Sequence, residues 1–223
     1  MVTYFELLTQ LSGLTLNWGM PFEIDSERVL NEFQNVFSNF QEGSQSGIYN
    51  DGGWKAIGLI TSGGDVREDR EISKVGKPYI PTPALQLCPY IRNILNRLPA
   101  DKKRVRFMSL QPGSEIKWHV DHKTSLDYHR SARFHIPIIT SSKVEFKICH
   151  NLCKWDSGKL YYGDFSFPHM VKNNWDKTRI HLVIDLVPND ELKSLFSKSF
   201  LQEEFKRKVL RNLCKRLLGK YQK

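Results

Sequence analysis

The feature that most constrains the fold of this chain is a dense run of short strand-like segments from Arg104 to Val187. Hydrophobic and polar residues alternate within these segments, and Pro-Gly, Ser-Ser and Asp-Ser-Gly turns separate them. Six or more strands within about eighty residues are typical of a β-sandwich or a β-barrel. We therefore expect a mainly β domain whose strands are RVRFMSL, SEIKWHVD, ARFHIPIIT, KVEFKIC, GKLYYGDFSF and TRIHLVIDLV.

Helices are expected before this run of strands. Hydrophobic residues recur on one helical face over 25–40, with Asp25 or Ser26 as the N-cap, and a second helical pattern covers 84–98. Pro89 lies close enough to the start of this second pattern to be tolerated within it. Two helices are therefore predicted to precede the main sheet.

The remaining segments complete a single domain, 1–223. Residues 41–83 are expected to form loops with one or two short strands, such as WKAIGLI, and amphipathic helices follow Pro188. A chain of 223 residues fits one domain, which we divide into N-terminal helices and substrate loops (1–103), a strand-rich core (104–188) and basic C-terminal helices (189–223). The C-terminal helices are expected to pack outside the barrel, with one stripe formed by Leu201, Phe205, Val209, Leu210, Leu213 and Leu217.

The formal net charge of +9 is concentrated near the C-terminus, where 201–223 holds eight Lys or Arg and two Glu. We expect these charges to form the solvated face of a docked helix; contact with nucleic acid, an acidic partner or anionic lipid is the alternative that we do not favour. No hydrophobic run is long enough to span a bilayer, and the first residues do not resemble a secretory signal, so we expect a cytoplasmic protein with reduced cysteines. Cys149 and Cys153 lack the second ligand pair of a zinc finger.

A metal site is predicted from His119, Asp121 and His169. Residues i and i+2 of a strand point to the same face, so His119 and Asp121 in WHVD can offer an imidazole and a carboxylate to one point. His169 in SFPHMV lies just before the last strong strand, where a barrel could bring it opposite this pair. Two histidines and a carboxylate on one face of an octahedral ion form the facial triad of non-haem iron(II) oxygenases. The same ligands can hold a hydrolytic zinc ion, so the identity of the metal stays open.

Arg179 is the candidate for binding an anion near this metal. It follows His169 by ten residues, and strand alternation places its side chain on the same face as that of His181. A guanidinium inside a barrel needs an anion, because an unpaired buried charge is costly. The anion is either a bound carboxylate or an Asp or Glu of a neighbouring strand.

The segment 104–185 resembles the aspartyl/asparaginyl beta-hydroxylase family, and within it the free-amino-acid branch typified by L-proline cis-4-hydroxylase. The resemblance rests on an ordered series of a Pro-Gly turn, H-x-D, R-x-H, S-x-P-H and R-I-H-L-V-I-D. The corresponding stretches are RFMSLQPGSEIKWHVD, RFHIPI, YGDFSFPHMVKN and TRIHLVIDL, with weaker similarity upstream in PALQLCPYIRNIL.

This resemblance implies a fold and a set of cofactors. The implied fold is a double-stranded beta-helix, the cupin-like jelly roll, with α-helices at its N- and C-terminal ends and with 104–188 as the jelly-roll core. His119, Asp121 and His169 are implied to bind iron(II), and Arg179 to anchor the distal carboxylate of 2-oxoglutarate. His135 in RFHIPI is implied to make a further contact with that cosubstrate. Dioxygen is the other cosubstrate, and we expect ascorbate to stimulate turnover.

The same resemblance restricts the class of substrates that we expect. Arg106 and Arg133 lie on strands flanking the site, where the proline-hydroxylase branch uses arginine to hold a substrate carboxylate. Metazoan peptide-hydroxylating relatives lack the carboxylate ligand, which this chain keeps as Asp121. The Asp121 carboxylate also favours hydroxylation over halogenation, because a halogenase needs that position on the metal vacant for a halide. We therefore expect hydroxylation of an unactivated C–H bond in a free amino acid or a related small metabolite.

Two other functions remain open at this point. The first is the same chemistry on a protein side chain or a nucleic acid, in view of the basic C-terminal segment. The second is a non-catalytic cupin-like module that binds a partner through that segment and needs no iron.

Overall fold

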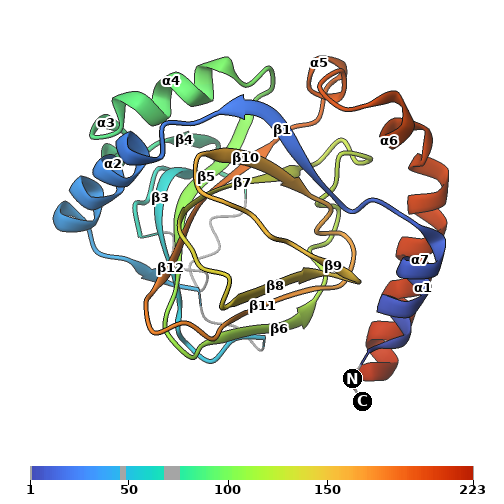
Figure 1. Cartoon of the computed structure of the whole chain (residues 1–223). Coiled ribbons are helices and arrows are strands. Elements are labelled where there is room, and N and C mark those ends of the chain that lie inside the picture. Colours follow the sequence, from blue (N-terminus) through green and yellow to red (C-terminus); the bar gives the residue numbers. More distant parts are fainter. Residues whose placement is uncertain (1, 46–48, 68–75, 223) are drawn as a thin grey trace.

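Two antiparallel sheets face each other in the computed structural model, which describes residues 2–45, 49–67 and 76–222 (Figure 1). The large sheet has the order β1 (Asn17–Glu23), β10 (Lys159–Gly163), β7 (Ala132–Ile139), β12 (Arg179–Leu186), β5 (Lys102–Leu110), β3 (Trp54–Ser62) and β2 (Gly43–Ser44), with β4 (Tyr79–Pro81) paired to β3. The small sheet has the order β6 (Glu115–His119), β11 (His169–Asn173), β8 (Val144–Ile148) and β9 (Asn151–Leu152). The strands predicted from the sequence are therefore confirmed, and the large sheet also recruits strands from before residue 104.

Helices lie outside this pair of sheets. The helices before the main run of strands are α1 (Tyr4–Ser12), α2 (Ser26–Asn39), α3 (Pro83–Gln86) and α4 (Pro89–Arg97). Those after it are α5 (Asp190–Lys193), α6 (Lys198–Gln202) and α7 (Glu204–Tyr221). Among the described residues, no helix combines the length and the apolar character needed to cross a membrane.

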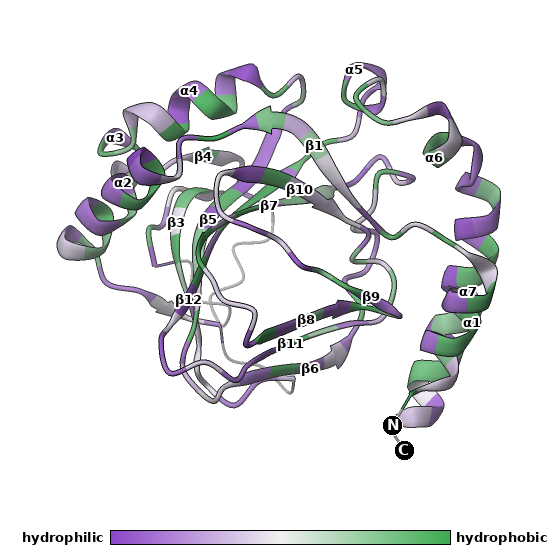
Figure 2. Cartoon of the chain, in the orientation of Figure 1, coloured by the Kyte–Doolittle hydropathy of each residue, from purple (hydrophilic) through white to green (hydrophobic). Residues whose placement is uncertain are grey.

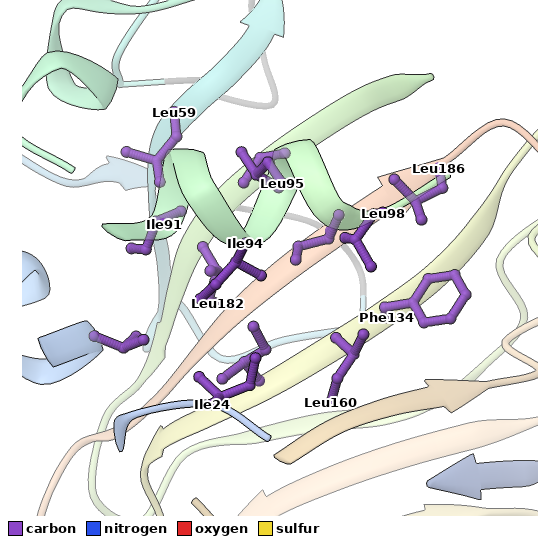
Figure 3. Packing of buried hydrophobic residues seen from close by; sticks show 14 of the residues in the cluster. Ile24, Leu59, Ile91, Ile94, Leu95, Leu98, Phe134, Leu160, Leu182 and Leu186 are labelled. Carbon is purple, nitrogen blue, oxygen red and sulfur yellow. The ribbon is translucent and has the colours of Figure 1, made fainter. Parts of the chain in front are cut away.

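Strand alternation divides the large sheet into an outer hydrophobic face and an inner polar face. On β12, Ile180, Leu182, Ile184 and Leu186 join the hydrophobic cluster beneath α2 and α4 (Figure 3). The residues between them point to the space between the two sheets, and they are Arg179, His181, Val183 and Asp185. Residues of β5 and β7 alternate between the two faces in the same way, and the polar residues on their inner face include Arg106, Arg133 and His135. The period of two thus collects the polar residues of three adjacent strands in one chamber.

The predicted helix over 84–98 is two helices, and Pro89 is the reason. Proline has no N–H to donate and disfavours a helical conformation for the residue before it. Cys88 accordingly leaves the helical region, with φ −122° and ψ 62°, and α4 starts at Pro89. The Glu32 carboxylate of α2 accepts hydrogen bonds from the backbone N–H groups of Tyr90 and Ile91, at 2.6 and 2.9 Å, and so caps the new helix.

The C-terminal helix packs on the barrel through a different face from the predicted stripe. Its buried residues are Arg207, Arg211, Cys214 and Leu218, whereas Phe205, Val209 and Leu213 of the predicted stripe are exposed. Ion pairing explains why this face is buried. Arg207 and Arg211 point toward the barrel because two buried carboxylates lie beneath them.

Those carboxylates are Asp127 and Asp164. Two guanidinium nitrogens of Arg207 donate to Asp127, Nε at 2.8 Å and Nη2 at 2.7 Å. Arg211 Nη2 donates to Asp127 at 2.7 Å and to Asp164 at 2.9 Å. Ser125 joins the network by donating to Asp164 at 3.0 Å. The helix is therefore held to the loop that follows β6, through Asp127, and to the segment that follows β10, through Asp164.

Breaking this network should destabilise the protein. Arg211→Ala removes a partner of the fully buried Asp164 carboxylate, and loss of one member of a buried ion pair costs about 3–5 kcal/mol. Urea denaturation should show a decrease of that size in the free energy of unfolding. Lys208→Ala on the exposed face of the same helix is the matched control and should change it by less than about 0.5 kcal/mol. Equal effects of the two substitutions would contradict the structural role of Arg211.

Candidate metal centre

His119, Asp121 and His169 come together at one end of the small sheet. His119 is the last residue of β6 and His169 the first of β11, and the two residues are register partners in these neighbouring strands. Their ring centroids lie 4.1 Å apart, and the Nε2 atom of each ring lies 4.0 Å from a carboxylate oxygen of Asp121. One ligand atom from each residue lies within 4.8 Å of the others, so the three side chains can share one metal ion.

The route by which these residues meet differs from the sequence-based expectation in two respects. His169 reaches the site from the strand next to His119 and not from across the barrel. Asp121 lies beyond the end of β6, so a loop and not strand alternation sets its position. Its backbone N–H donates to the Phe165 carbonyl oxygen at 2.9 Å. This hydrogen bond holds the start of the loop against the segment that joins β10 to β11.

Hydrogen bonds to backbone carbonyls fix the orientation of both histidine rings. His119 Nδ1 lies 2.7 Å from the Lys117 carbonyl oxygen, and His169 Nδ1 lies 2.9 Å from that of Phe167. A carbonyl oxygen can only accept, so each Nδ1 carries the proton and each Nε2 presents a lone pair. Burial lowers the pKa of His169 to about 3, which keeps that ring neutral and able to bind a metal.

Arg133 holds the Asp121 carboxylate. Its Nη1 donates to Asp121, while its Nε and Nη2 donate to Asp185 at 2.7 and 3.1 Å. Asp121 follows the small sheet and Asp185 belongs to the large sheet, so one guanidinium ties the two sheets together at the metal site. Despite the raising effect of burial, Arg133 and the two histidines hold the pKa of Asp121 well below its usual value. The carboxylate is therefore ionised and oriented before any metal binds.

Arg179 lies in the same chamber with no carboxylate partner in the described part of the chain. The side chain is buried, its Nη2 donates to His181 Nδ1 at 2.8 Å, and its Nε has no hydrogen-bond partner. The guanidinium also packs 5.2 Å from the centroid of the Phe146 ring. Burial lowers the pKa of Arg179 to about 9, as expected for a cation that lacks a neutralising anion.

Aromatic rings connect Arg179 to the three candidate ligands. His135 Nδ1 lies 3.2 Å from His181 Nδ1, and the Nε2 atoms of both rings are buried without a partner. Phe165 lies between the two groups, 5.2 Å from the ring of His135 and 4.9 Å from that of His169. The interior between the sheets thus contains three polar side chains with unused hydrogen-bonding nitrogens, next to the triad.

These residues fit an iron ion and a bound carboxylate. Two unprotonated imidazole nitrogens and an ionised carboxylate are the donor set of a facial triad. A dicarboxylate entering the chamber would supply the acceptors that the Arg179 guanidinium and the His181 Nε2 proton lack. The buried Arg179 guanidinium, which has no carboxylate partner among the described residues, distinguishes this chamber from an ordinary polar core.

Arg106 and Arg133 do not extend freely into the chamber. Arg133 pairs with Asp121 and Asp185, and Arg106 Nη2 lies 3.8 Å from Asp185. The sequence-based search missed Asp185, although alternation along β12 puts it on the same face as Arg179 and could have revealed it. It also missed Tyr49, whose ring stacks on His119 at a centroid distance of 5.4 Å and which has no sequence signal of its own.

Comparison with known proteins decides the family. The family model described as aspartyl/asparaginyl beta-hydroxylase matches residues 23–188, about three quarters of the chain. The chain belongs to this family. The predicted enzyme class, a non-haem iron hydroxylase dependent on 2-oxoglutarate, is therefore confirmed at the level of the family, with iron(II), 2-oxoglutarate and dioxygen as its cofactor and cosubstrates.

Individual relatives of this hydroxylase chain are distant. An ornithine lipid ester-linked acyl 2-hydroxylase from Rhizobium tropici is 23% identical over 184 residues, which cover 78% of this chain and 58% of the relative. The chain thus spans less than two thirds of that protein. A 2OG-Fe(II) oxygenase family structure from Burkholderia pseudomallei has a TM-score of 0.51 at 13% identity, covering 83% of this chain and 89% of the other.

A prolyl hydroxylase from Trichoplax adhaerens, solved with a peptide fragment of a hypoxia inducible factor, gives a TM-score of 0.50 at 14% identity. The match covers 87% of this chain and 94% of that chain. At these identities the two structures bear on the fold alone, and they confirm the predicted jelly roll.

Buried neutral histidines should make the metal-free hydroxylase sensitive to acid. Burial lowers the pKa of His135, His169 and His181 below the ordinary value of 6.5. The unfolded chain therefore takes up protons first as the pH falls through about 6.5. The free energy of unfolding then decreases, by up to about 1.4 kcal/mol per pH unit for each histidine.

Urea denaturation of the metal-free protein between pH 7 and pH 5 measures this dependence. His181→Phe removes one of the three buried rings and should reduce the slope by about the contribution of one histidine. A free energy of unfolding that stays constant over this range would show that the three rings are not held neutral.

Proposed function

We propose that this chain hydroxylates an unactivated C–H bond of a free amino acid or a closely related small metabolite, with iron(II) at His119, Asp121 and His169. The observation that carries the proposal is the buried arginine beside the candidate triad. Arg179 has no carboxylate partner among the described residues, and its Nε has no hydrogen-bond partner there. Arg106 and Arg133 lie on the same inner face of the large sheet, next to Asp185. Guanidinium groups on one face of a site match carboxylates of small substrates in charge and in geometry.

The surface next to the loop of Asp121 favours an anionic substrate as well. A cleft of about 840 Å³ is lined by Lys102, Lys103, Lys123 and Arg130, and Asp101 is the one acid among its described lining residues. A concentration of one sign of charge raises the local concentration of ligands of the opposite sign.

The proposed chemistry divides between the cofactors and the protein. When bound, iron(II) with 2-oxoglutarate and dioxygen supplies the oxidation: one oxygen atom enters the substrate C–H bond, and the other enters succinate as carbon dioxide is released. The carbonyl-bound rings of His119 and His169 present Nε2 to the metal and need no rearrangement. Arg133 keeps Asp121 ionised and aimed at the same point.

Cosubstrate binding is assigned to the far end of the chamber. Arg179 would anchor the distal carboxylate of 2-oxoglutarate, and His135 and His181 offer the adjacent hydrogen-bonding nitrogens. Phe146 and Phe165 lie between the two sheets with their ring centroids 6.0 Å apart, beside the residues assigned to the cosubstrate. Charge interactions are stronger next to apolar rings than in water.

A second candidate substrate is an acyl chain carried by a lipid, because the Rhizobium tropici relative is an ornithine lipid ester-linked acyl 2-hydroxylase. The same residues would hold the metal and 2-oxoglutarate. The two candidates differ only in the molecule that carries the C–H bond, a free amino acid in the first and a lipid acyl chain in the second.

Turnover assays distinguish these substrates. Purified protein is supplied with iron(II), ascorbate, 2-oxoglutarate and either an amino-acid panel or vesicles containing an ornithine lipid, and succinate and the oxygenated product are measured. We expect at least one amino acid to stimulate succinate formation. Arg179→Gln should raise the KM for 2-oxoglutarate by about tenfold to a hundredfold, because a hydrogen bond to a charged group contributes about 1.5–3 kcal/mol.

Arg106→Gln is the matched comparison on the same sheet face. It should raise the KM for the amino acid and leave that for 2-oxoglutarate within about twofold. Stimulation by the lipid alone would favour the second candidate. An absence of stimulated succinate from both substrate classes, with iron bound, would overturn the proposed function.

A further inference from the structure

Helices α1 and α7 carry an exposed hydrophobic surface that neither the metal centre nor the core uses. The two helices pack side by side on one flank of the barrel, and the N- and C-terminal ends of the chain lie close together there (Figure 1). Lys206 of α7 donates to the Ser12 carbonyl oxygen at the end of α1. At the opposite end, the rings of Phe5 and Tyr221 lie 6.1 Å apart. The helices are therefore antiparallel and share one outward surface.

Large hydrophobic side chains form a stripe on each helix. Tyr4, Leu7 and Leu11 of α1 follow an i, i+3, i+7 spacing, and Tyr4 and Leu11 are 80% and 79% exposed. Phe205, Val209 and Leu213 of α7 follow an i, i+4, i+8 spacing, and Phe205 is 77% exposed. Figure 2 shows hydrophobic segments along both helices. Single exposed hydrophobic residues are ordinary, whereas two adjacent stripes indicate an interaction surface.

Positive charge surrounds this hydrophobic surface. The stripe of α7 continues at the same helical spacing into Arg216 and Lys220, and Lys208 and Lys215 flank it. These four basic residues are exposed, while Glu204 is the one exposed acid among the described residues of the two helices, which gives four positive charges against one negative. The surface therefore combines hydrophobic side chains with an excess of three positive charges.

We propose that this α1/α7 surface docks on an anionic membrane surface. A helix that lies in the plane of a bilayer buries hydrophobic side chains at the boundary between headgroups and acyl chains and places Lys and Arg among the anionic headgroups. Both components are present here, on the same outward face. The buried face of α7 meanwhile stays anchored to Asp127 and Asp164, so docking requires no rearrangement of the fold.

Charge complementarity favours a membrane over two other partners. A second copy of the chain related by two-fold symmetry would bring the two positive surfaces together, and like charges across an interface are unfavourable. A nucleic acid would pair with the basic residues but would leave Leu11, Val209 and Leu213 without an apolar partner. This proposal is independent of which substrate the metal centre takes.

Vesicle flotation with the full chain tests the proposal. The protein should float with vesicles of phosphatidylcholine and phosphatidylglycerol, and much less with phosphatidylcholine alone. Added salt should weaken binding, because it screens exposed charges. The variants Leu11→Ser/Phe205→Ser and Lys208→Glu/Arg216→Glu should each lower the partition coefficient at least tenfold. All four positions are exposed, and unchanged urea denaturation curves would show that the variants fold.

Matched controls come from the opposite side of the molecule. Phe37→Ser replaces a hydrophobic residue that is 51% exposed on α2, and Arg92→Glu reverses an exposed charge on α4. Both should leave flotation unchanged. The proposal is overturned by an absence of flotation with anionic vesicles, by flotation that Leu11→Ser/Phe205→Ser leaves intact, or by equal losses in the controls. A dimer that this double variant dissociates, or duplex nucleic acid bound in place of vesicles, would identify the other partners and overturn it as well.

Discussion

The ion bridge made by Arg133 is the interaction on which the candidate active site depends. Arg133 lies on β7 and donates to Asp185 of β12 and to Asp121, which follows β6. One guanidinium, on a side chain that is 14% exposed, therefore connects the large sheet to the loop that supplies the carboxylate of the triad. A buried charge is tolerated only when it is paired, so the same bridge that satisfies Arg133 fixes the position and the ionisation of Asp121.

Two different kinds of charge occupy the interior between the sheets. Around Asp121 the cations are paired with carboxylates of the protein, whereas Arg179 has no such partner among the described residues. The first arrangement holds Asp121 in position as a candidate metal ligand. The second leaves the Arg179 guanidinium able to bind a carboxylate. Chemistry of the 2-oxoglutarate type needs both, a preformed metal face and a fixed anchor for a dicarboxylate.

Strand alternation and helical spacing depend on neighbouring residues, and they predicted most of the strands and helices. Alternation also indicates that Asp185 shares a face with Arg179, but it cannot show which residue of another strand pairs with it. Arg133, its partner, lies 52 residues away in the sequence. The helical period correctly predicted an amphipathic helix outside the barrel, but it cannot reveal that Asp127 and Asp164 hold Arg207 and Arg211 against the barrel. The break at Pro89 was a matter of local chemistry and could have been predicted.

The central claim is that His119, Asp121 and His169 bind one iron ion. Anaerobic titration with iron(II), followed by metal analysis of the desalted protein, tests it most directly. The wild type should retain one iron per chain, and His169→Ala and Asp121→Ala should each lose it while His122→Ala, next to Asp121 in the exposed loop, retains it. Full iron retention by either ligand variant in a folded protein would contradict the assignment of the metal centre.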